Sequence, residues 1–238
     1  MNQTYSERYN PQPGQTFYLH LSDLLMALKR YSTNDKVRVL DYGCRTSPYR
    51  LLFPNAEFVR ADLAGEDNVE YVIDSQGRVN EESEHFDYIL LTQVLAHVKN
   101  TQSCLRECNR LLKRGGSLLV STHGTYWDAP CPTDFWRWTA DGLKEELQQA
   151  GFEVLDMQKA TTGGRALMFL MDFQIKRVYG SRRHLVGMLL WLLNRILSAR
   201  KRGFHLWCDR YLHHSRVTDS STCAGSLYIA LVARARKM

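Results

Sequence analysis

Short apolar runs alternate with amphipathic stretches along most of the chain, and this alternation predicts strands separated by helices. The apolar runs, several of them rich in β-branched residues, fall at 37–43, 57–63, 69–74, 86–93, 116–124, 153–158 and 226–235. Apolar residues at helical spacing predict helices at 14–31, 101–113 and 140–150. We expect Ser47 and Pro48 to begin a further helix, and Gly115 with Gly116 to end the one at 101–113.

Strands that alternate with helices indicate an α/β fold, here a doubly wound, Rossmann-like sheet of seven strands. The sheet is expected to be mostly parallel, with an antiparallel last strand. Residues 161–218 break the alternation, and we interpret them as a basic helical insertion before the last strand. The predicted organisation is a core with its N-terminal helix at 1–160, the insertion at 161–218, and a final strand at 219–238 that returns to the sheet.

Charge is distributed unevenly along the chain. The 31 Lys and Arg residues exceed the 25 Asp and Glu residues, for a net charge of +6. Residues 176–238 hold 13 of the basic residues but only two acidic ones, a net of +11, so residues 1–175 carry −5 with 18 basic and 23 acidic residues. The basic and aromatic residues of the last quarter follow no RNA- or DNA-binding motif, which argues against a nucleic-acid partner.

The basic ends of the segment 176–202 flank the most apolar stretch of the chain, residues 185–193. Nine residues are too few to cross a bilayer, which takes about 20. Two interpretations stay open: an interfacial helix attracted to an anionic membrane surface, or a helix that packs in the core or forms a homodimer contact. The polar N-terminus lacks the apolar core of a signal peptide, so we expect a cytoplasmic protein, with any peripheral membrane association at the inner face.

Polar residues recur where the predicted strands end, and ligands of doubly wound sheets bind at that edge. These residues are Asp41 and Gly43 after the first strand, Asp62 and Asp74 after the second and third, and Gln93 and His123 after the next two. An acidic residue about 20 positions after the first turn suits the hydroxyls of a ribose. The first loop, GCRTSP, is not a phosphate-binding loop, so we expect a nucleoside ligand without phosphates. The six cysteines form no CxxC pair, which predicts packed thiols and no bound metal.

Five segments, in order, resemble motifs of the class I S-adenosylmethionine-dependent methyltransferases, in particular bacterial members of the type 11 kind. VLDYGCRTSPY resembles motif I, written VLDxGCGTxPY, and RADL resembles the second-strand acidic motif. FDYILLTQVLAHV and LLKRGGSLLVSTHG resemble the FDxVxxxxVLEHV and LKPGGxLxxSxP segments, and TDFWRWTADGLKEELQQAGF resembles a DYWRFTxxGLxxLLxxAGF segment. Motif I is degenerate, because Arg45 replaces the second glycine, and Ala96 replaces the Glu of VLEHV.

The resemblance implies S-adenosylmethionine as cofactor and gives individual residues a role. Asp41 would orient the methionine amino group, Gly43 would let the main chain approach the cofactor, and Asp62 would accept hydrogen bonds from the ribose hydroxyls. The other implied cofactor-binding residues are Cys44 and Arg45 in the first loop, Leu63 against the adenine, Asp74 and Ser75 near the adenine amine, and Gln93 and Val94 on the methionine side. Arg45 either obstructs the cofactor or reaches its carboxylate.

Methyl transfer to an oxygen acceptor needs a base, and the candidates are His123, Asp134 and His97. His97 also has a purely structural interpretation, and Asp134 also has one as an ion-pair partner of Arg137. The aromatic loop 125–139 is either a lid over the acceptor or a cover for the sheet edge. As a lid it would offer four acceptor-binding residues, namely Tyr126, Trp127, Trp136 and Arg137.

The leading hypothesis is therefore S-adenosylmethionine-dependent methyl transfer to a small-molecule, sugar or lipid-linked glycan acceptor. The alternative is a degenerate methyltransferase fold that serves as a non-catalytic binding or scaffold protein, and Arg45 and Ala96 motivate it.

Overall fold

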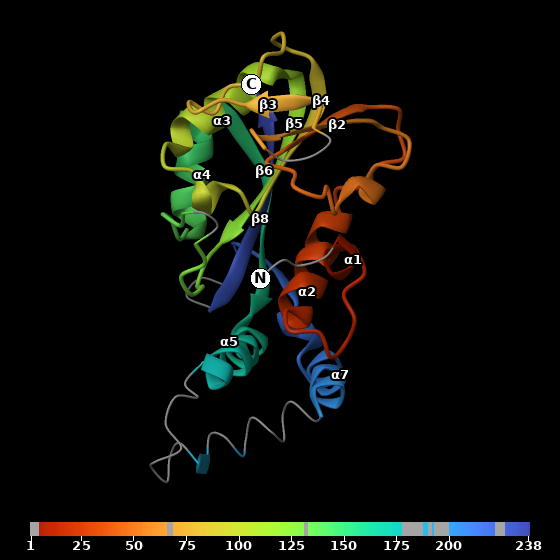
Figure 1. Cartoon of the computed structure of the whole chain (residues 1–238), viewed down its shortest axis with the longest axis vertical. Coiled ribbons are helices and arrows are strands. Elements are labelled where there is room, and N and C mark those ends of the chain that lie inside the picture. The colour runs from red at the N-terminus through yellow and green to blue at the C-terminus, as the bar shows by residue number, and fades with distance from the viewer. Residues whose placement is uncertain are drawn as a thin grey trace.

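The computed structural model describes residues 5–65, 69–130, 133–177, 188–189, 192, 200–221 and 227–238. All seven expected strands are present in one sheet, with an eighth that the sequence pattern did not predict. The strands are β1 (Arg38–Tyr42), β2 (Glu57–Leu63), β3 (Tyr71–Ile73), β4 (Phe86–Thr92), β5 (Leu112–His123), β6 (Phe152–Thr162), β7 (Val217–Asp219) and β8 (Tyr228–Lys237). Their order across the sheet is β3-β2-β1-β4-β5-β8-β6-β7 (Figure 1).

The sheet is parallel from β3 to β5, and the expected antiparallel last strand is confirmed. β8 inserts between β5 and β6 and runs antiparallel to both, with Val120 opposite Ala233 and Met157 opposite Ala233 on its other side. The additional strand β7 pairs antiparallel with β6 at the outer edge, where Lys159 lies opposite Thr218. The apolar pattern missed it because β7 is three residues long and depends on main-chain pairing with the long strand β6.

Helices cover both faces of the sheet. Those described are α1 (Tyr5–Tyr9), α2 (Tyr18–Lys29), α3 (Thr101–Leu111), α4 (Ala140–Gln149), α5 (Gly163–Arg177) and α7 (Lys201–Tyr211), with short 3₁₀ helices at Arg50–Leu52, Leu95–His97 and His213–Ser215. Figure 1 shows α3 and α4 on one face and α1 and α2 on the other, while α5 and α7 lie at the end of the molecule farthest from β3. Side chains at the starts of two helices satisfy otherwise unpaired amides, since Asn100 caps α3 and Thr139 caps α4.

Two local predictions are wrong. No α-helix begins at Ser47, which has φ +48 and is followed by the short 3₁₀ helix. The helix α3 ends at Leu111, before the Gly115–Gly116 pair, because Leu112 already pairs with Phe86 as the first residue of β5. The glycines belong to an irregularity in that strand, and Gly115 takes φ +75 there.

The core has two main parts, one on each face of the sheet. Under α3 and α4 it includes Leu105, Leu143 and Phe152, and under α2 it includes Leu28 and Leu119. A third, smaller cluster joins α2, α5 and α7 through Tyr18, Phe169 and Cys208 among others. The two helices α5 and α7, which belong to the described part of the segment 161–218, therefore pack on the core.

Buried charges reinforce that third cluster. The fully buried guanidinium of Arg165 on α5 lies 2.6 Å from the Asp23 carboxylate of α2 and 2.9 Å from the Asp209 carboxylate of α7. Arg216 also pairs with Asp23, at 2.8 Å, and the Tyr18 hydroxyl donates to Asp209 at 2.5 Å. This Asp23–Arg165 network ties three helices together that are far apart in the sequence.

Most of the apolar stretch 185–193 lies outside the described residues, and so do Cys131 and Cys223. The four other cysteines are buried free thiols. Over the part of the chain that is described, no helix is long and apolar enough to cross a membrane.

Candidate functional site

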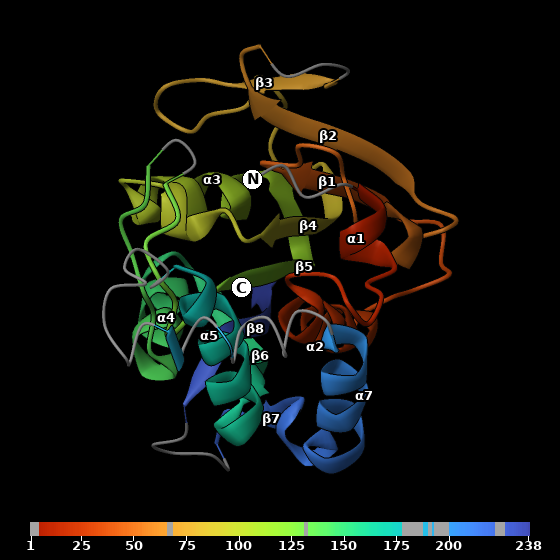
Figure 2. The same cartoon turned by 60° about the horizontal axis from the view of Figure 1, so that its bottom comes forward.

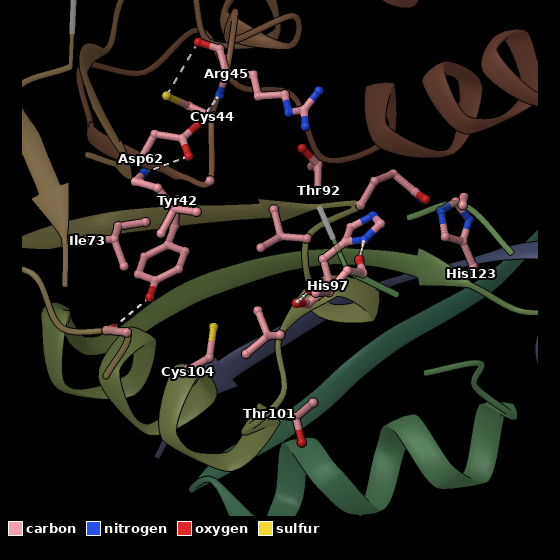
Figure 3. Close-up of a pocket in the computed structure, with 18 of the residues that line it drawn as sticks. Tyr42, Cys44, Arg45, Asp62, Ile73, Thr92, His97, Thr101, Cys104 and His123 are labelled. Carbon is pink, nitrogen blue, oxygen red and sulfur yellow. Dashed lines mark hydrogen bonds between the residues drawn. The ribbon is translucent and has the colours of Figure 1, made fainter. Parts of the chain in front are cut away.

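A cleft of about 1680 Å³ opens at the carboxyl ends of the parallel strands. The loops after β1, β2, β3 and β4 line one half, which we call the cofactor half. The other half, the acceptor half, is lined by α2, α5, and the segment after β5. In the view of Figure 3, Asp62, Cys44 and Arg45 lie on one side and His97 and His123 on the other.

Gly43 makes the first turn of the cofactor half sterically possible. It has φ +73, and a Cβ atom there would lie 2.6 Å from Cγ2 of Val94 in the loop after β4. Only glycine combines that backbone conformation with so close an approach of the neighbouring loop. Gly43 and Val94 both line the cleft, as predicted.

Arg45 keeps the backbone conformation that the replaced glycine would provide. Its φ is +45, and its main-chain amide donates a 2.6 Å hydrogen bond to Oδ2 of Asp62. Its side chain lines the cleft beside Cys44, whose backbone amide bonds Ala61 of the next strand. The unusual residue in motif I therefore leaves the main-chain shape of the loop intact.

Asp62 lies at the cleft edge of β2, and two main-chain amides hold its carboxylate. Besides the bond from Arg45, the amide of Leu63 donates to Oδ1 at 2.8 Å. The carboxylate is buried, 7% exposed, and each of its oxygens keeps a further lone pair for a ligand hydroxyl. The apolar side chain of Leu63, by contrast, is 52% exposed at the cleft wall.

Asp74 and Ser75 follow β3 and complete this wall next to Leu63, which lies opposite Ile73 in the β2–β3 pairing. The amides of Gln76 and Arg78 each donate to Oδ1 of Asp74 at 2.8 Å, and these bonds hold the pKa of Asp74 below its usual range. Its other carboxylate oxygen is the one that suits a ligand amine.

Gln93 follows β4 with φ +59, and its amide donates to the Ser121 carbonyl at 2.8 Å. Its side-chain Nε2 bonds the Ser121 hydroxyl at 3.2 Å, while Oε1 is buried with no hydrogen-bond partner among the described residues. A buried acceptor at the cleft wall is a ready partner for a ligand donor.

Asp41 does not line the cleft, unlike the nine other residues predicted to bind the cofactor. It is buried beneath the loop that carries Gly43, and Oδ2 has no hydrogen-bond partner among the described residues. Burial, together with the nearby Asp62 carboxylate, raises its pKa to about 7. Any effect of Asp41 on a ligand is exerted through the loop above it.

An aromatic stack forms the acceptor half. His123 at the end of β5 stacks on Tyr126 with ring centroids 4.1 Å apart, Tyr126 stacks on Trp127 at 3.9 Å, and Trp127 stacks on Phe173 of α5 at 3.5 Å. All four side chains line the cleft. Tyr126 and Trp127 therefore line the cleft, and an acceptor contact for them stays a prediction.

His123 is buried, and burial lowers the pKa of its imidazole well below the usual range, with the charges of His20 and Arg137 adding to the effect. The ring is therefore neutral at physiological pH. Its Nδ1 has no hydrogen-bond partner among the described residues.

His97 follows β4 and faces the same space, 6.5 Å from His123 between ring centroids. Its Nδ1 lies 2.6 Å from the Thr133 carbonyl, so Nδ1 carries the proton and donates to that oxygen. With the proton on Nδ1, Nε2 is the nitrogen that can accept a proton. Both histidines line the cleft, and the role of base stays a prediction for each.

Of the two interpretations of Asp134, the structure supports the ion pair with Arg137 and not the base. It forms a two-pronged ion pair with Arg137, with both oxygens 2.6 Å from guanidinium nitrogens, and it accepts from the Ala129 amide. This pairing lowers its pKa to about 2, and the residue does not line the cleft. A carboxylate so strongly stabilised is a poor base.

Arg137 and Trp136 are also placed differently from the prediction, since neither lines the cleft. Arg137 donates to the carbonyls of Tyr126 and Trp127 as well as to Asp134, so it holds the loop's shape. Trp136 donates to the Val98 carbonyl at 2.9 Å. An acceptor contact for either residue has no support in this geometry.

His20 on α2 is a cleft residue that sequence reasoning missed. It is 3% exposed, its ring lies 6.3 Å from that of His123, and burial lowers its pKa to about 3. A histidine at helical spacing from Phe17 and Leu24, on the otherwise apolar face of a helix, was the available signal. No group of three His, Cys, Asp or Glu side chains is arranged to hold a metal within the described ranges.

Comparison with known proteins identifies the fold. The family profile of the methyltransferase domain matches residues 15–157, which is more than half of the chain. The chain belongs to the methyltransferase-domain family. A sequence search of curated proteins finds no match.

Several solved structures share the fold at low identity. The [4+2]-cyclase SpnF aligns over 92% of this chain and 82% of its own, with TM-score 0.54 and 19% identity. A Bacillus halodurans protein provisionally assigned as a methyltransferase aligns over 91% and 99%, with TM-score 0.53 and 17% identity. The Haemonchus contortus phosphoethanolamine N-methyltransferase 2, solved with phosphomonomethylethanolamine and S-adenosylhomocysteine, aligns over 98% of this chain and 56% of its own, with TM-score 0.52 and 16% identity.

S-adenosylmethionine is the cofactor that membership of this methyltransferase family implies, and the residues of the cofactor half fit it. The turn at Gly43 brings the main chain to the cleft, and the Asp62 carboxylate has lone pairs for ribose hydroxyls. The exposed Leu63 side chain offers a surface for the adenine, and the unpartnered Oε1 of Gln93 offers an acceptor for the methionine amino group.

Proposed function

We propose that this methyltransferase transfers a methyl group to a hydroxyl of a small-molecule, sugar or lipid-linked glycan acceptor. The observation that carries the proposal is that one cleft is lined both by nine residues suited to S-adenosylmethionine and by two histidines suited to accept a proton. When bound, the cofactor supplies an activated methyl group, so the protein's part is to position the acceptor and to take its proton.

The cofactor half holds the donor in place. The two amides on the Asp62 carboxylate fix its orientation before the ligand arrives, so binding loses little side-chain freedom. Gln93 is fixed in the same way by its two bonds to Ser121. These groups are preorganised by main chain and by neighbouring strands.

The acceptor half receives the acceptor and its proton. His97 is the first candidate base, because its bond to Thr133 fixes the tautomer that leaves Nε2 able to accept. His123 is the second, since burial keeps it neutral, although a lowered pKa also makes it the weaker base. The stacked rings of Tyr126 and Trp127 present a flat, mostly apolar wall that suits the C–H face of a sugar or another ring.

Calorimetry with S-adenosylmethionine tests the cofactor half. We expect binding by the native chain and a loss of affinity of at least about tenfold in Asp62→Asn, because the Asn amide has one accepting oxygen and its NH2 group cannot accept. Glu145→Gln, an exposed carboxylate on α4, is the matched control and should bind like the native chain. No binding at millimolar cofactor would sink the enzyme proposal in favour of a non-catalytic binding protein.

Transfer of labelled methyl to a panel of simple sugars, lipid-linked sugars and small alcohols tests the acceptor half. With an accepted substrate, His97→Gln should lower kcat about 100-fold near neutral pH and lose less as the pH rises, since hydroxide replaces the base. His214→Gln, an exposed imidazole, is the control. If neither His97→Gln nor His123→Gln changes kcat, the histidines are not bases; if only amines are methylated, the acceptor class is wrong.

A further inference from the structure

The helix α7 has two faces of opposite character. Its inner face is fixed to the core, because His205 and Cys208 are buried and Asp209 is paired with Arg165 and Tyr18. The helix therefore cannot rotate to bury its other side. Figure 2 shows α7 at one end of the molecule, beside α2.

The outer face of α7 exposes large apolar side chains. Leu206 is 50% exposed, Trp207 48% and Tyr211 54%. Trp207 and Tyr211 are one helical turn apart, with ring centroids 5.6 Å apart. Side chains with an apolar body and a polar tip are typical of surfaces that contact the membrane interface.

Cations flank these rings. Arg202 and Arg210 are exposed on the same helix, and the Arg210 guanidinium lies over the Tyr211 ring, 5.5 Å from its centroid. The only acidic residue of α7, Asp209, is turned inward. None of the ion pairs found among the described residues involves Arg202 or Arg210, and the last quarter of the chain carries a net charge of +11. The outer face is therefore apolar and positively charged at once.

We propose that the outer face of α7 (Arg202, Leu206, Trp207, Arg210 and Tyr211) docks on an anionic membrane surface, with the helix lying in the interface plane. The rings and Leu206 would enter the headgroup region, while the two arginines bind lipid phosphates. This surface shares only Arg202 with the segment 176–202 that the sequence pattern indicated, and its other residues lie after that segment. The proposal does not depend on the reaction proposed above.

Charge argues for a membrane over a second copy of the chain. A two-fold dimer would place the same face on both subunits, so the arginines of one copy would approach those of the other with no acidic side chain on the face to offset them. An anionic lipid surface meets the same cations with opposite charge.

Vesicle sedimentation of the full chain tests the proposal. We expect binding to phosphatidylcholine vesicles that contain phosphatidylglycerol, weak binding to phosphatidylcholine alone, and loss of binding as salt rises. Arg202→Glu with Arg210→Glu should abolish binding, and Trp207→Ser with Leu206→Ser should weaken it about tenfold or more.

Matched controls separate docking from misfolding and from non-specific attraction. Leu51→Ser removes an equally exposed apolar side chain elsewhere, and Arg114→Glu reverses an 87% exposed cation elsewhere; both should bind like the native chain. Thermal unfolding of each variant checks the fold. A blue shift of tryptophan fluorescence on vesicle binding, absent in Trp207→Phe, would place the Trp207 ring in lipid.

Two outcomes would overturn the proposal. One is binding that does not depend on anionic lipid or that survives the α7 variants. The other is self-association of the native chain, abolished by Trp207→Ser and without vesicle binding, which would assign the face to a second copy.

Discussion

The cofactor half of the cleft is built from the ends of four neighbouring strands, whereas the acceptor half is built from α2, α5 and the segment after β5. In the cofactor half, main-chain amides and left-handed residues fix the carboxylate of Asp62. In the acceptor half, stacked rings join the segment after β5 to α5, and a buried ion pair joins α5 to α2, from which it is separated by 142 residues between Asp23 and Arg165. The cofactor half therefore depends on backbone geometry, whereas the acceptor half depends on side-chain packing.

The largest loss of stability is expected from disrupting the buried Asp23–Arg165 network, whose helices α2 and α5 line the acceptor half. Arg165→Met leaves the Asp23 and Asp209 carboxylates buried with fewer partners, so the free energy of unfolding should fall by ~3–5 kcal/mol in urea denaturation. Arg236→Met removes an exposed ion pair with Glu153, and it should lower the free energy of unfolding by under ~1 kcal/mol. S-adenosylmethionine affinity should stay within a few-fold of native; a loss as large as that of Asp62→Asn would show that the two halves are not independent.

Two glycines test the role of backbone geometry in the cofactor half. Gly43→Ala should lower the free energy of unfolding by ~2–4 kcal/mol, because the added Cβ would sit at a strained φ and 2.6 Å from Cγ2 of Val94. Gly65→Ala has φ +97 but nothing within 4 Å of the added carbon, so only the conformational cost of ~1–2 kcal/mol remains. Equal losses of stability in the two variants would mean that the Val94 contact is unimportant.

A pH-dependent effect is expected at Asp41 beneath the same loop. Its pKa is raised to about 7 in the folded chain, above its value in the unfolded chain, so this group lowers stability progressively as pH rises from about 4 to 7. Asp41→Asn should therefore stabilise the protein by ~2 kcal/mol at about pH 8.5 and leave it nearly unchanged at about pH 4. Denaturation at both values measures this, and a gain independent of pH would contradict the assignment.

The smallest effect is expected at Arg45. Arg45→Gly keeps φ +45 accessible and keeps the amide bond to Asp62, so stability should change by under ~1 kcal/mol and S-adenosylmethionine affinity by less than about threefold. Calorimetry of the native chain and of Arg45→Gly measures the two affinities for S-adenosylmethionine. A tenfold weaker affinity would show that the side chain contacts the cofactor, and a tenfold tighter one that it obstructs.

The strand ends could be read from the sequence because burial on both faces gives parallel strands a continuous apolar pattern. That pattern placed Gly43, Asp62 and Gln93 at one edge, and all three line the cleft. It could not place Asp134, because the choice between free base and ion pair depends on the path of an irregular loop. It also missed His20, whose neighbour His123 is a hundred residues away.

The sequence by itself determined the α/β fold, the methyltransferase family and the cofactor edge of the sheet, because local periodicity and short motifs specify these features. The tertiary structure alone decided which side chains form the acceptor wall, that Arg45 leaves its loop undistorted, and that α7 turns Trp207 outward. These depend on the packing of distant segments, where one buried group such as Arg165 selects which faces meet.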